Sequence, residues 1–406
     1  MVEVHGWVAK GYGLVREEFE RNFRDTGELG AACCVIVRNQ VVANLWAGKV
    51  EKGDPGKAWA QNTVANVYSS TKAMGAISLL HLSSQGFCCL SDPIAKYWPA
   101  FGQNGKEGIS IAMLLSHRAG LNYLDAHRLS YDEVKQWTRF LKARRGNPHT
   151  VPPSLLNRLE QQKPHWSDNT GIIGYNPILR GFYLSYLVSC IDPLHRGVGE
   201  YLRDNITTPI GAEFYCGIPR GFAPGRITRL YTEDDADHRV DHPDKSMEIL
   251  PPSFKGLAQS KEEDLAALPT GEILHHSFNV IQPRFSPWQL RHEELPSAIG
   301  YTTAESLARI YSTIANEESA KAVGFNPNIV RTNTVPSVTG FDICLGCERF
   351  YSNAGFFHNP AFPTAFMQGG TGGSLGAGDH VLGVGFAYVP NALRQPTSPE
   401  TVSRAE

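Results

Sequence analysis

Short runs of apolar positions bounded by polar ones predict strands near both ends of the chain. Residues 14–23 carry apolar side chains at helical spacing with charges between them, which is typical of an amphipathic helix. Apolar runs at 31–37 and 41–46, separated by Asn39-Gln40, predict a hairpin. Towards the other end, strands are expected near Phe341–Leu345, Ala365–Gln368 and Val381–Val389.

Helical patterns fill the middle of the chain. A long apolar helix is expected to open with Val67 and to stop at Gly86. Further helices are expected at 112–115, 131–145, 178–189, 198–205 and 303–315. From Gly217 to Pro296 many prolines and isolated aromatics show little period, so long loops with short helices are expected. The sequence therefore predicts an α+β fold, with one antiparallel sheet built from both chain ends around a helical insertion.

Composition and charge limit which partners the protein could bind and in which cellular compartment it is expected. The 406 residues are 42% hydrophobic and carry 38 Lys+Arg against 40 Asp+Glu, a net charge of −2. This balance excludes a mostly disordered chain and gives no basic footprint for nucleic acid. No apolar stretch of about 20 residues is present, so no membrane partner is expected. Eight cysteines are too sparse for a disulfide scaffold, and two adjacent pairs in apolar runs predict buried thiols. We expect a cytoplasmic protein.

Two clusters of metal-ligating residue types are weak candidates. Cys344 and Cys347 are half of a zinc site and have no second pair with ligand spacing. His238 and His242, in the acidic segment 233–244, are four residues apart and could share a helix face. Such a segment is more often a solvated loop or part of a lid, and we expect no metal and no other cofactor.

The candidate chemistry lies in Ser69-Ser70-Thr71-Lys72, at the start of the long apolar helix. Positions i and i+3 share a helix face, so the Lys72 amine can reach the Ser69 hydroxyl. A desolvated lysine loses its proton more easily and can then help to deprotonate the serine. The helix N-terminus also offers N–H groups where an oxyanion would form. The alternative is a purely structural role, with a serine that caps the helix and a lysine exposed to solvent.

Four segments in order resemble the serine β-lactamase-like superfamily of penicillin-binding proteins, class C β-lactamases and related esterases and acyltransferases. They begin at Val67, Asp92, Leu114 and Gly370, and read VYSSTK, DPIAKYWP, LLSHRAGL and GTGGSLG. The resemblance implies the β-lactamase/transpeptidase-like fold as a single domain over 1–391. Its α/β part would cover about 1–87 and 297–391, its insertion about 88–296, and a polar tail 392–406.

The resemblance also implies the other site residues. Tyr175, which follows the family-like segment Trp166–Thr170, would take the nucleophile's proton as a phenolate stabilised by Lys72; a core tyrosine is the alternative. Asn176 could contact Lys72 or substrate, although its position does not fit the family's Tyr-x-Asn form. Oxyanion donors would be the backbone N–H groups of Ser69 and Thr371. The third motif is Gln368-Gly369-Gly370, where penicillin-binding proteins have Lys-Thr-Gly and many relatives have His.

An uncharged Gln368 can only hydrogen-bond to a substrate, which favours an ester over a β-lactam. The expected function is a serine hydrolase or acyltransferase that acts on a small-molecule ester, with water or an alcohol as acceptor. Phe278, Phe285 and Trp288 would roof an apolar pocket. Two alternatives stay open. One is a β-lactamase or D-aminopeptidase. The other is a non-hydrolytic enzyme or inactive scaffold, favoured by Gln368 and by Ile299-Gly300-Tyr301, where relatives often have Asn-Gly-His.

A second serine also matches a hydrolase pattern. Gly372-Gly373-Ser374-Leu375-Gly376 has the Gly-x-Ser-x-Gly spacing of the α/β-hydrolase nucleophile elbow. That elbow needs an acid and a histidine further along the chain, and only 30 residues follow Gly376. Close glycine packing in the third motif is the more plausible role for this segment.

Overall fold

A computed structural model describes residues 2–53, 57–125, 127–166, 171–232, 280–282 and 285–393. Several predictions lie outside these residues: His238, His242, Phe278 and the segment 167–170 that precedes Tyr175. The site described below is built from the described residues alone.

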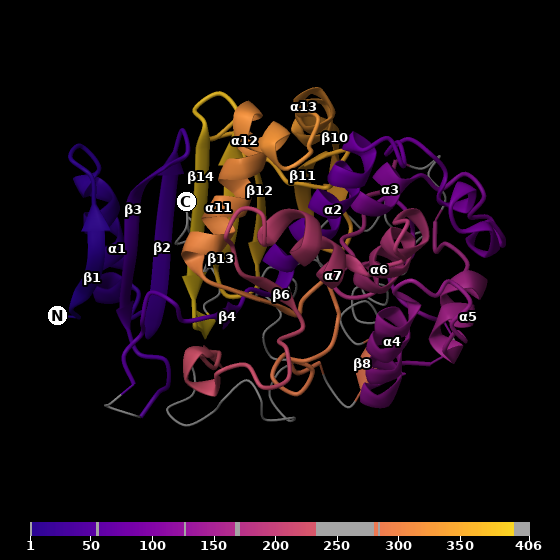
Figure 1. Ribbon diagram of the computed structural model, residues 1–406, viewed down its shortest axis with the longest axis horizontal. Coiled ribbons are helices and arrows are strands. Elements are labelled where there is room, and N and C mark those ends of the chain that lie inside the picture. Colours follow the sequence, from indigo (N-terminus) through magenta and orange to yellow (C-terminus); the bar gives the residue numbers. More distant parts are fainter. Residues whose placement is uncertain are drawn as a thin grey trace.

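A six-stranded antiparallel sheet forms one side of the molecule and joins the two ends of the chain (Figure 1). Its middle pairing is between β2 and β14, in register with Cys33 opposite Tyr388. The prediction of a sheet built from both termini is therefore confirmed. In spatial order the strands are β1 (Val4–Val8), β3 (Gln40–Gly48), β2 (Gly30–Val37), β14 (Val384–Pro390), β13 (Ser374–Asp379) and β12 (Ala365–Gly370).

Both faces of this sheet are covered by helices. Helix α1 (Gly13–Asp25) packs Phe19 against Cys33 and Tyr388 on one face, while α11 (Ala304–Ala315) contacts β2, β13 and β14 on the other. Because successive strand residues point to opposite faces, Cys33 and Cys34 are both buried but in different clusters. The second adjacent pair differs from the prediction, since Cys88 is buried and Cys89 is exposed.

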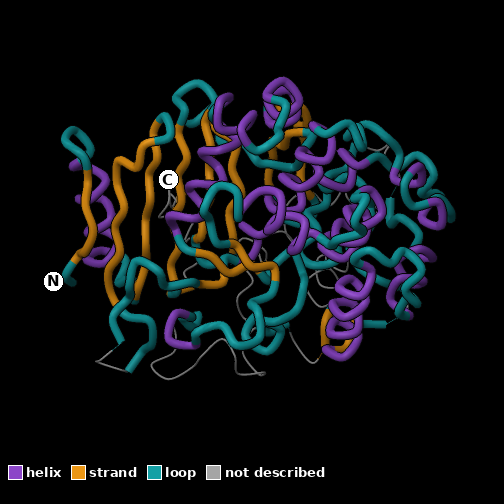
Figure 2. The backbone as a smooth tube through the Cα atoms, viewed as in Figure 1, coloured by secondary structure: helices purple, strands orange, loops and turns teal. Residues whose placement is uncertain are grey.

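The rest of the chain forms a helical region beside the sheet (Figure 2). Helix α2 (Lys72–Ser84) lies at its centre, buried along almost its whole length, and packs against α6 and α7. The other helices are α3 (Ile111–Leu115), α4 (Tyr131–Arg144), α5 (Ser154–Gln161), α6 (Arg180–Ile191), α7 (Val198–Leu202), α12 (Glu317–Ala322) and α13 (Pro327–Thr334). Single turns are η1 (Tyr68–Thr71), η2 (Ile94–Lys96), η3 (Pro99–Phe101), η5 (Arg203–Thr207) and η6 (Pro224–Arg226).

Short strand pairings join segments that are far apart in the sequence. Strand β9 (Gly300–Thr302) pairs with both β4 (Ala65–Asn66) and β6 (Phe214–Cys216). Strand β5 (Leu129–Ser130) pairs with β8 (Ile281–Gln282). The strand expected at 341–345 is instead the hairpin of β10 (Pro336–Asp342) and β11 (Cys347–Ser352), with a turn between them. Ala392 and Leu393, expected in the polar tail, form β15, which pairs with β7 (Tyr231–Thr232).

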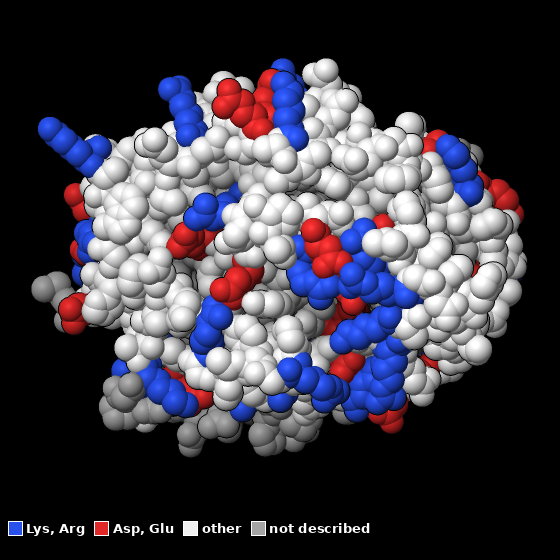
Figure 3. All heavy atoms as spheres, in the orientation of Figure 1, with Lys and Arg blue, Asp and Glu red and all other residues white. Residues whose placement is uncertain are grey.

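Charged side chains on the face in Figure 3 gather over the helical region, where several arginines and lysines cluster near α4 and α7. Arg145 forms ion pairs with Glu200 and Asp204, and Arg203 pairs with Asp204, so the cluster is partly neutralised. No helix among the described residues is long and apolar enough to cross a membrane.

Candidate active site

Ser69 lies in a strained turn that leads into α2. Tyr68, directly before it, has a φ of 41°, in the left-handed region that non-glycine residues rarely adopt. The turn is held by Tyr68 N–H, which donates to Asn66 Oδ1 at 2.9 Å, and by Val67 N–H, which donates to Gly300 O at 2.9 Å. Strain of this kind persists only where the surroundings impose it, and it clusters at active sites. The predicted helix thus begins five residues late, at Lys72 instead of Val67, after a 3₁₀ turn that presents Ser69.

Lys72 and Tyr175 both reach the Ser69 hydroxyl, so the structure brings the three predicted catalytic residues together. Lys72 Nζ lies 3.0 Å from Ser69 Oγ, and the Tyr175 hydroxyl lies 2.7 Å from the same atom. Lys72 Nζ is also 5.0 Å from the centroid of the Tyr175 ring. These are hydrogen-bond distances, as proton transfer to or from Ser69 requires.

The surroundings of Lys72 favour its neutral form. Its Nζ lies 2.7 Å from Pro177 O and 2.9 Å from Ser297 O, and the side chain is 1% exposed. Burial, together with the nearby Arg180 guanidinium, lowers the pKa of Lys72 well below its usual value. Carbonyl oxygens only accept, so they take two N–H groups of the amine. In a neutral Lys72 the nitrogen lone pair is then left facing Ser69 Oγ, which is the arrangement of a general base.

The expected phenolate at Tyr175 is not supported. Burial raises the pKa of Tyr175 to about 12, and the nearby Asp342 carboxylate adds to the rise, while the hydrogen bond to Ser69 and the Arg180 guanidinium oppose it. The desolvation of the phenolate outweighs the attraction of the surrounding cations. Tyr175 therefore keeps its proton at neutral pH and donates it to Ser69 Oγ.

Ser374, the serine of the elbow-like pattern, is buried and ties the third motif to the nucleophile turn. Its hydroxyl donates to Val67 O at 2.8 Å and lies 3.2 Å from Ser70 Oγ. Ser70 Oγ in turn lies 3.1 Å from Gln368 O, on the neighbouring strand. Ser374 is only 4% exposed. These contacts give Ser374 a structural role.

We expect Ser374→Ala to lower the melting temperature while Ser69 remains the residue labelled by a fluorophosphonate. The substitution removes one of the two hydrogen bonds that Val67 O accepts, since Ser70 N–H also donates to it at 3.0 Å, and a hydrogen bond of this kind typically contributes about 0.5–1.5 kcal/mol. Differential scanning fluorimetry and mapping of the labelled peptide measure the two parts. Loss of the label together with an unchanged melting temperature would instead make Ser374 the nucleophile.

The third motif packs directly against the nucleophile turn. A Cβ on Gly370 would lie 2.2 Å from Val67 O and 3.1 Å from Ser69 N, so only glycine fits there. Thr371, whose backbone N–H is the second predicted oxyanion donor, follows Gly370 in the turn between β12 and β13. Gln368 is 5% exposed and its amide donates to Gly369 O at 3.1 Å. Its side chain is thus engaged within the strand.

Asn176 is engaged within the fold rather than with Lys72. Its amide donates to Leu121 O at 2.6 Å, and its Oδ1 accepts from Arg180 N at 3.0 Å. Pro177 O takes the place that an asparagine side chain was expected to fill beside Lys72. Sequence reasoning missed Pro177 and Ser297, because both act through backbone carbonyls that no residue type signals.

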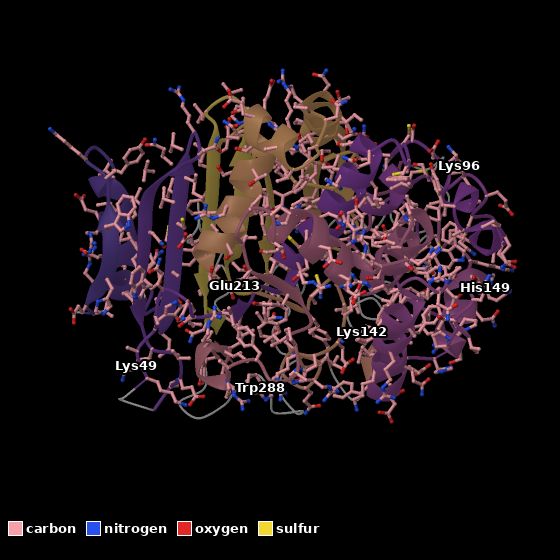
Figure 4. All side chains as sticks on the ribbon, in the orientation of Figure 1. Lys49, Lys96, Lys142, His149, Glu213 and Trp288 are labelled. Atoms are coloured by element: carbon pink, nitrogen blue, oxygen red, sulfur yellow. The ribbon has the colours of Figure 1, made fainter. Side chains whose placement is uncertain are left out.

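The aromatic roof is only partly as expected. The Phe285 ring lies 6.3 Å from the Tyr68 ring, next to the nucleophile. Trp288, near the lower edge of Figure 4, lies between the Arg229 and Arg291 guanidiniums, 3.6 and 4.4 Å from its ring centroid. The part of the expected roof around Trp288 is therefore aromatic and cationic rather than purely apolar. Within the described ranges no three His, Cys, Asp or Glu side chains are grouped to hold a metal ion.

The chain is similar to known proteins in both sequence and fold. The family described as Beta-lactamase matches residues 17–405. The esterase/beta-lactamase LipL of Mycobacterium tuberculosis (strain ATCC 25618 / H37Rv) is 25% identical over 374 residues, 90% of this chain and 78% of that protein. A family VIII carboxylesterase superposes with a TM-score of 0.76 at 22% identity, over 97% of this chain and 95% of the other. A penicillin-binding protein homologue from Caulobacter crescentus gives 0.74 at 25% identity, over 96% and 94%.

Proposed function

The chain belongs to the beta-lactamase family, and we propose that it cleaves a small-molecule ester through an acyl-enzyme on Ser69. The observation that carries the proposal is the convergence of Lys72 Nζ and the Tyr175 hydroxyl on Ser69 Oγ, at 3.0 and 2.7 Å. A serine is a weak nucleophile until a neighbouring base takes its proton, and Lys72 is placed to do so.

In the proposed reaction neutral Lys72 accepts the Ser69 proton as Oγ attacks the ester carbonyl. Backbone N–H groups of Ser69 and Thr371 stabilise the oxyanion that forms. Tyr175 donates its proton to the departing alkoxide and regains one from protonated Lys72. An acyl group then remains on Ser69, and the alcohol leaves. A water molecule, or an acceptor alcohol, releases the acyl group by the reverse sequence, and this chemistry calls for no cofactor.

Gln368 supports an ester rather than a β-lactam as the substrate. An amide side chain carries no charge, so it offers no ion pair to the carboxylate of a penicillin. The Phe285 and Tyr68 rings beside the nucleophile support an apolar acyl group. A cytoplasmic location is part of this proposal and rests on the sparse cysteines.

The proposal is tested by incubating the protein with a fluorophosphonate and mapping the modified peptide. We expect one adduct, on the peptide that contains Ser69. Hydrolysis of p-nitrophenyl esters of increasing acyl length is then compared with hydrolysis of a chromogenic cephalosporin. Ester turnover is expected to exceed cephalosporin turnover by at least about 100-fold, the loss typical of one missing charge-stabilising contact.

Two outcomes would contradict the proposal. An adduct on Ser374, or no adduct with no ester turnover, would overturn the assignment of Ser69 and favour non-hydrolytic chemistry. Faster cephalosporin than ester hydrolysis would favour a β-lactamase, the second activity in the name of the esterase/beta-lactamase LipL.

A further inference from the structure

The backbone around Tyr175 is held by side chains from two segments that are far away in the sequence. Gly174 N–H donates to His117 O and Asn176 N–H donates to His117 Nδ1, both at 3.0 Å. Asn122 Nδ2 lies 3.0 Å from Gly174 O and 2.9 Å from Tyr175 O. The Tyr175 N–H donates to Asp342 Oδ1 at 3.0 Å.

Asp342 joins this stretch to the β10–β11 hairpin. The same Oδ1 atom accepts from Cys344 N at 2.9 Å and Leu345 N at 3.0 Å, and so closes the hairpin turn. Ile343 N–H donates to Ile173 O at 2.9 Å and adds a backbone link between the two segments. Asp342 has no exposed surface. A carboxylate in this position stays only because its hydrogen bonds are made.

The hydrogen bond between Tyr175 N–H and Asp342 also affects the position of the Tyr175 hydroxyl. Two side-chain torsions separate the Tyr175 backbone from its hydroxyl, and the ring packs against His117 with centroids 4.8 Å apart. A small tilt of the backbone is therefore amplified at the hydroxyl, which must stay 2.7 Å from Ser69 Oγ. Misplacement of a catalytic group by about 1 Å can cost about 100-fold in rate.

We propose that Asp342 is a positioning residue, which fixes the Tyr175 hydroxyl on Ser69 by accepting the Tyr175 backbone N–H. The inference rests on the proposed function, because it assigns Tyr175 a part in the reaction at Ser69. Asp342 does not touch the reacting atoms. Its other side-chain partners are the hairpin turn and the Tyr351 hydroxyl, 3.4 Å from Oδ2, and its part in the reaction is exerted through Tyr175.

The test measures the maximal rate and the half-saturating concentration of fluorophosphonate labelling in Asp342→Ala, Asp342→Asn, Tyr175→Phe and the Asp342→Ala/Tyr175→Phe double variant. Asp342→Ala is expected to lower the maximal rate by about five- to tenfold, no more than Tyr175→Phe itself, because fluoride leaves without a proton and only the orientation of Ser69 is lost, with little change in half-saturation. Asp342→Asn keeps a carbonyl oxygen and is expected to restore the rate to within about threefold. In the Tyr175→Phe background, Asp342→Ala is expected to cost less than about twofold.

Asp379 provides a matched control. Its Oδ1 accepts from Val381 N and Leu382 N, both at 2.8 Å, so it closes the β13–β14 turn in the same way without contacting Tyr175. Asp379→Ala is expected to lower the melting temperature and leave the labelling rate unchanged. If Asp342→Ala does not fold, Asp342→Thr replaces it, because its shorter side chain cannot reach the Tyr175 N–H.

Three results would overturn the inference. The first is a wild-type labelling rate in a folded Asp342→Ala or Asp342→Thr variant. The second is an equal penalty with and without the Tyr175 hydroxyl, which would mean that Asp342 acts on the fold in general. The third is a wild-type protein that is not labelled on Ser69, which would remove the proposed function and the inference with it.

Discussion

Lys72→Met is expected to lower the rate at which a fluorophosphonate labels Ser69 by about 10³-fold, within the range of a lost general base. Met fills a similar volume in this buried position but has no group that can accept the Ser69 proton. The carbonyls of Pro177 and Ser297 also lose their donor, so some stability is lost as well. Labelling rates followed by intact mass, at a temperature well below the melting point, separate the two effects.

Lys106→Met is the matched control for this variant. Lys106 is also buried, and its Nζ donates to three backbone carbonyls, those of Gln103, Glu160 and Gln162, at 2.6–3.0 Å. Burial lowers its pKa to about 8. It resembles Lys72 in its burial, its backbone carbonyl partners and its lowered pKa, but it does not contact Ser69. An equal loss of labelling in both variants would mean that Lys72 serves the fold alone.

The assignment of Lys72 as the base also fixes the sign of the pH dependence. The neutral amine is the active form, so labelling slows as the pH falls through the lowered pKa of Lys72. Tyr175 acts in its protonated form, and its pKa of about 12 places no limit on the alkaline side of the usual range. Labelling rates measured from pH 5 to 10 are therefore expected to show an acid limb and then a plateau.

The sequence was most informative where chemistry depends on spacing. Ser69 and Lys72 are three residues apart on one helical turn, and the structure places their reactive atoms at 3.0 Å. The hairpin of β2 and β3 was found from two apolar runs with polar residues between them. Strand β13 was missed because it is rich in glycine, which is uncommon in strands. The structure shows why: a Cβ on Gly376 or Gly378 would lie 2.3 Å from Tyr311 or 2.4 Å from Phe366.

Contacts made by backbone atoms, and the effect of burial on pKa values, could not be predicted from the sequence. Pro177 and Ser297 reach Lys72 with carbonyl oxygens, which every residue has. Asp342 lies 167 residues from Tyr175, and only the hairpin that ends β10 brings it there. The raised pKa of Tyr175 could not be predicted, because the attraction of a nearby lysine is visible in the sequence and the loss of water on burial is not.

Tyr175→Phe is expected to affect esters according to how good their leaving group is. An alkyl ester expels a strongly basic alkoxide, which needs the proton that Tyr175 donates, so its hydrolysis should fall by about 10³-fold. A p-nitrophenyl ester expels a weakly basic phenolate that needs no proton, and we expect a loss of only about tenfold, from weaker orientation of Ser69. Steady-state rates on alkyl and p-nitrophenyl esters of one acid measure this difference, because the acyl part is held constant.

Tyr183→Phe is the control for removing a buried hydroxyl. Tyr183 is fully buried, burial raises its pKa, and its hydroxyl donates to Leu159 O at 3.3 Å, away from Ser69. We expect this variant to retain wild-type rates on both esters. Equal losses on both esters in Tyr175→Phe would show that Tyr175 orients Ser69 without protonating the leaving group. The proton for the alkoxide would then have to come from Lys72, whose Nζ lies 3.0 Å from Ser69 Oγ. Lys72 carries a proton to give once it has accepted the one from Ser69.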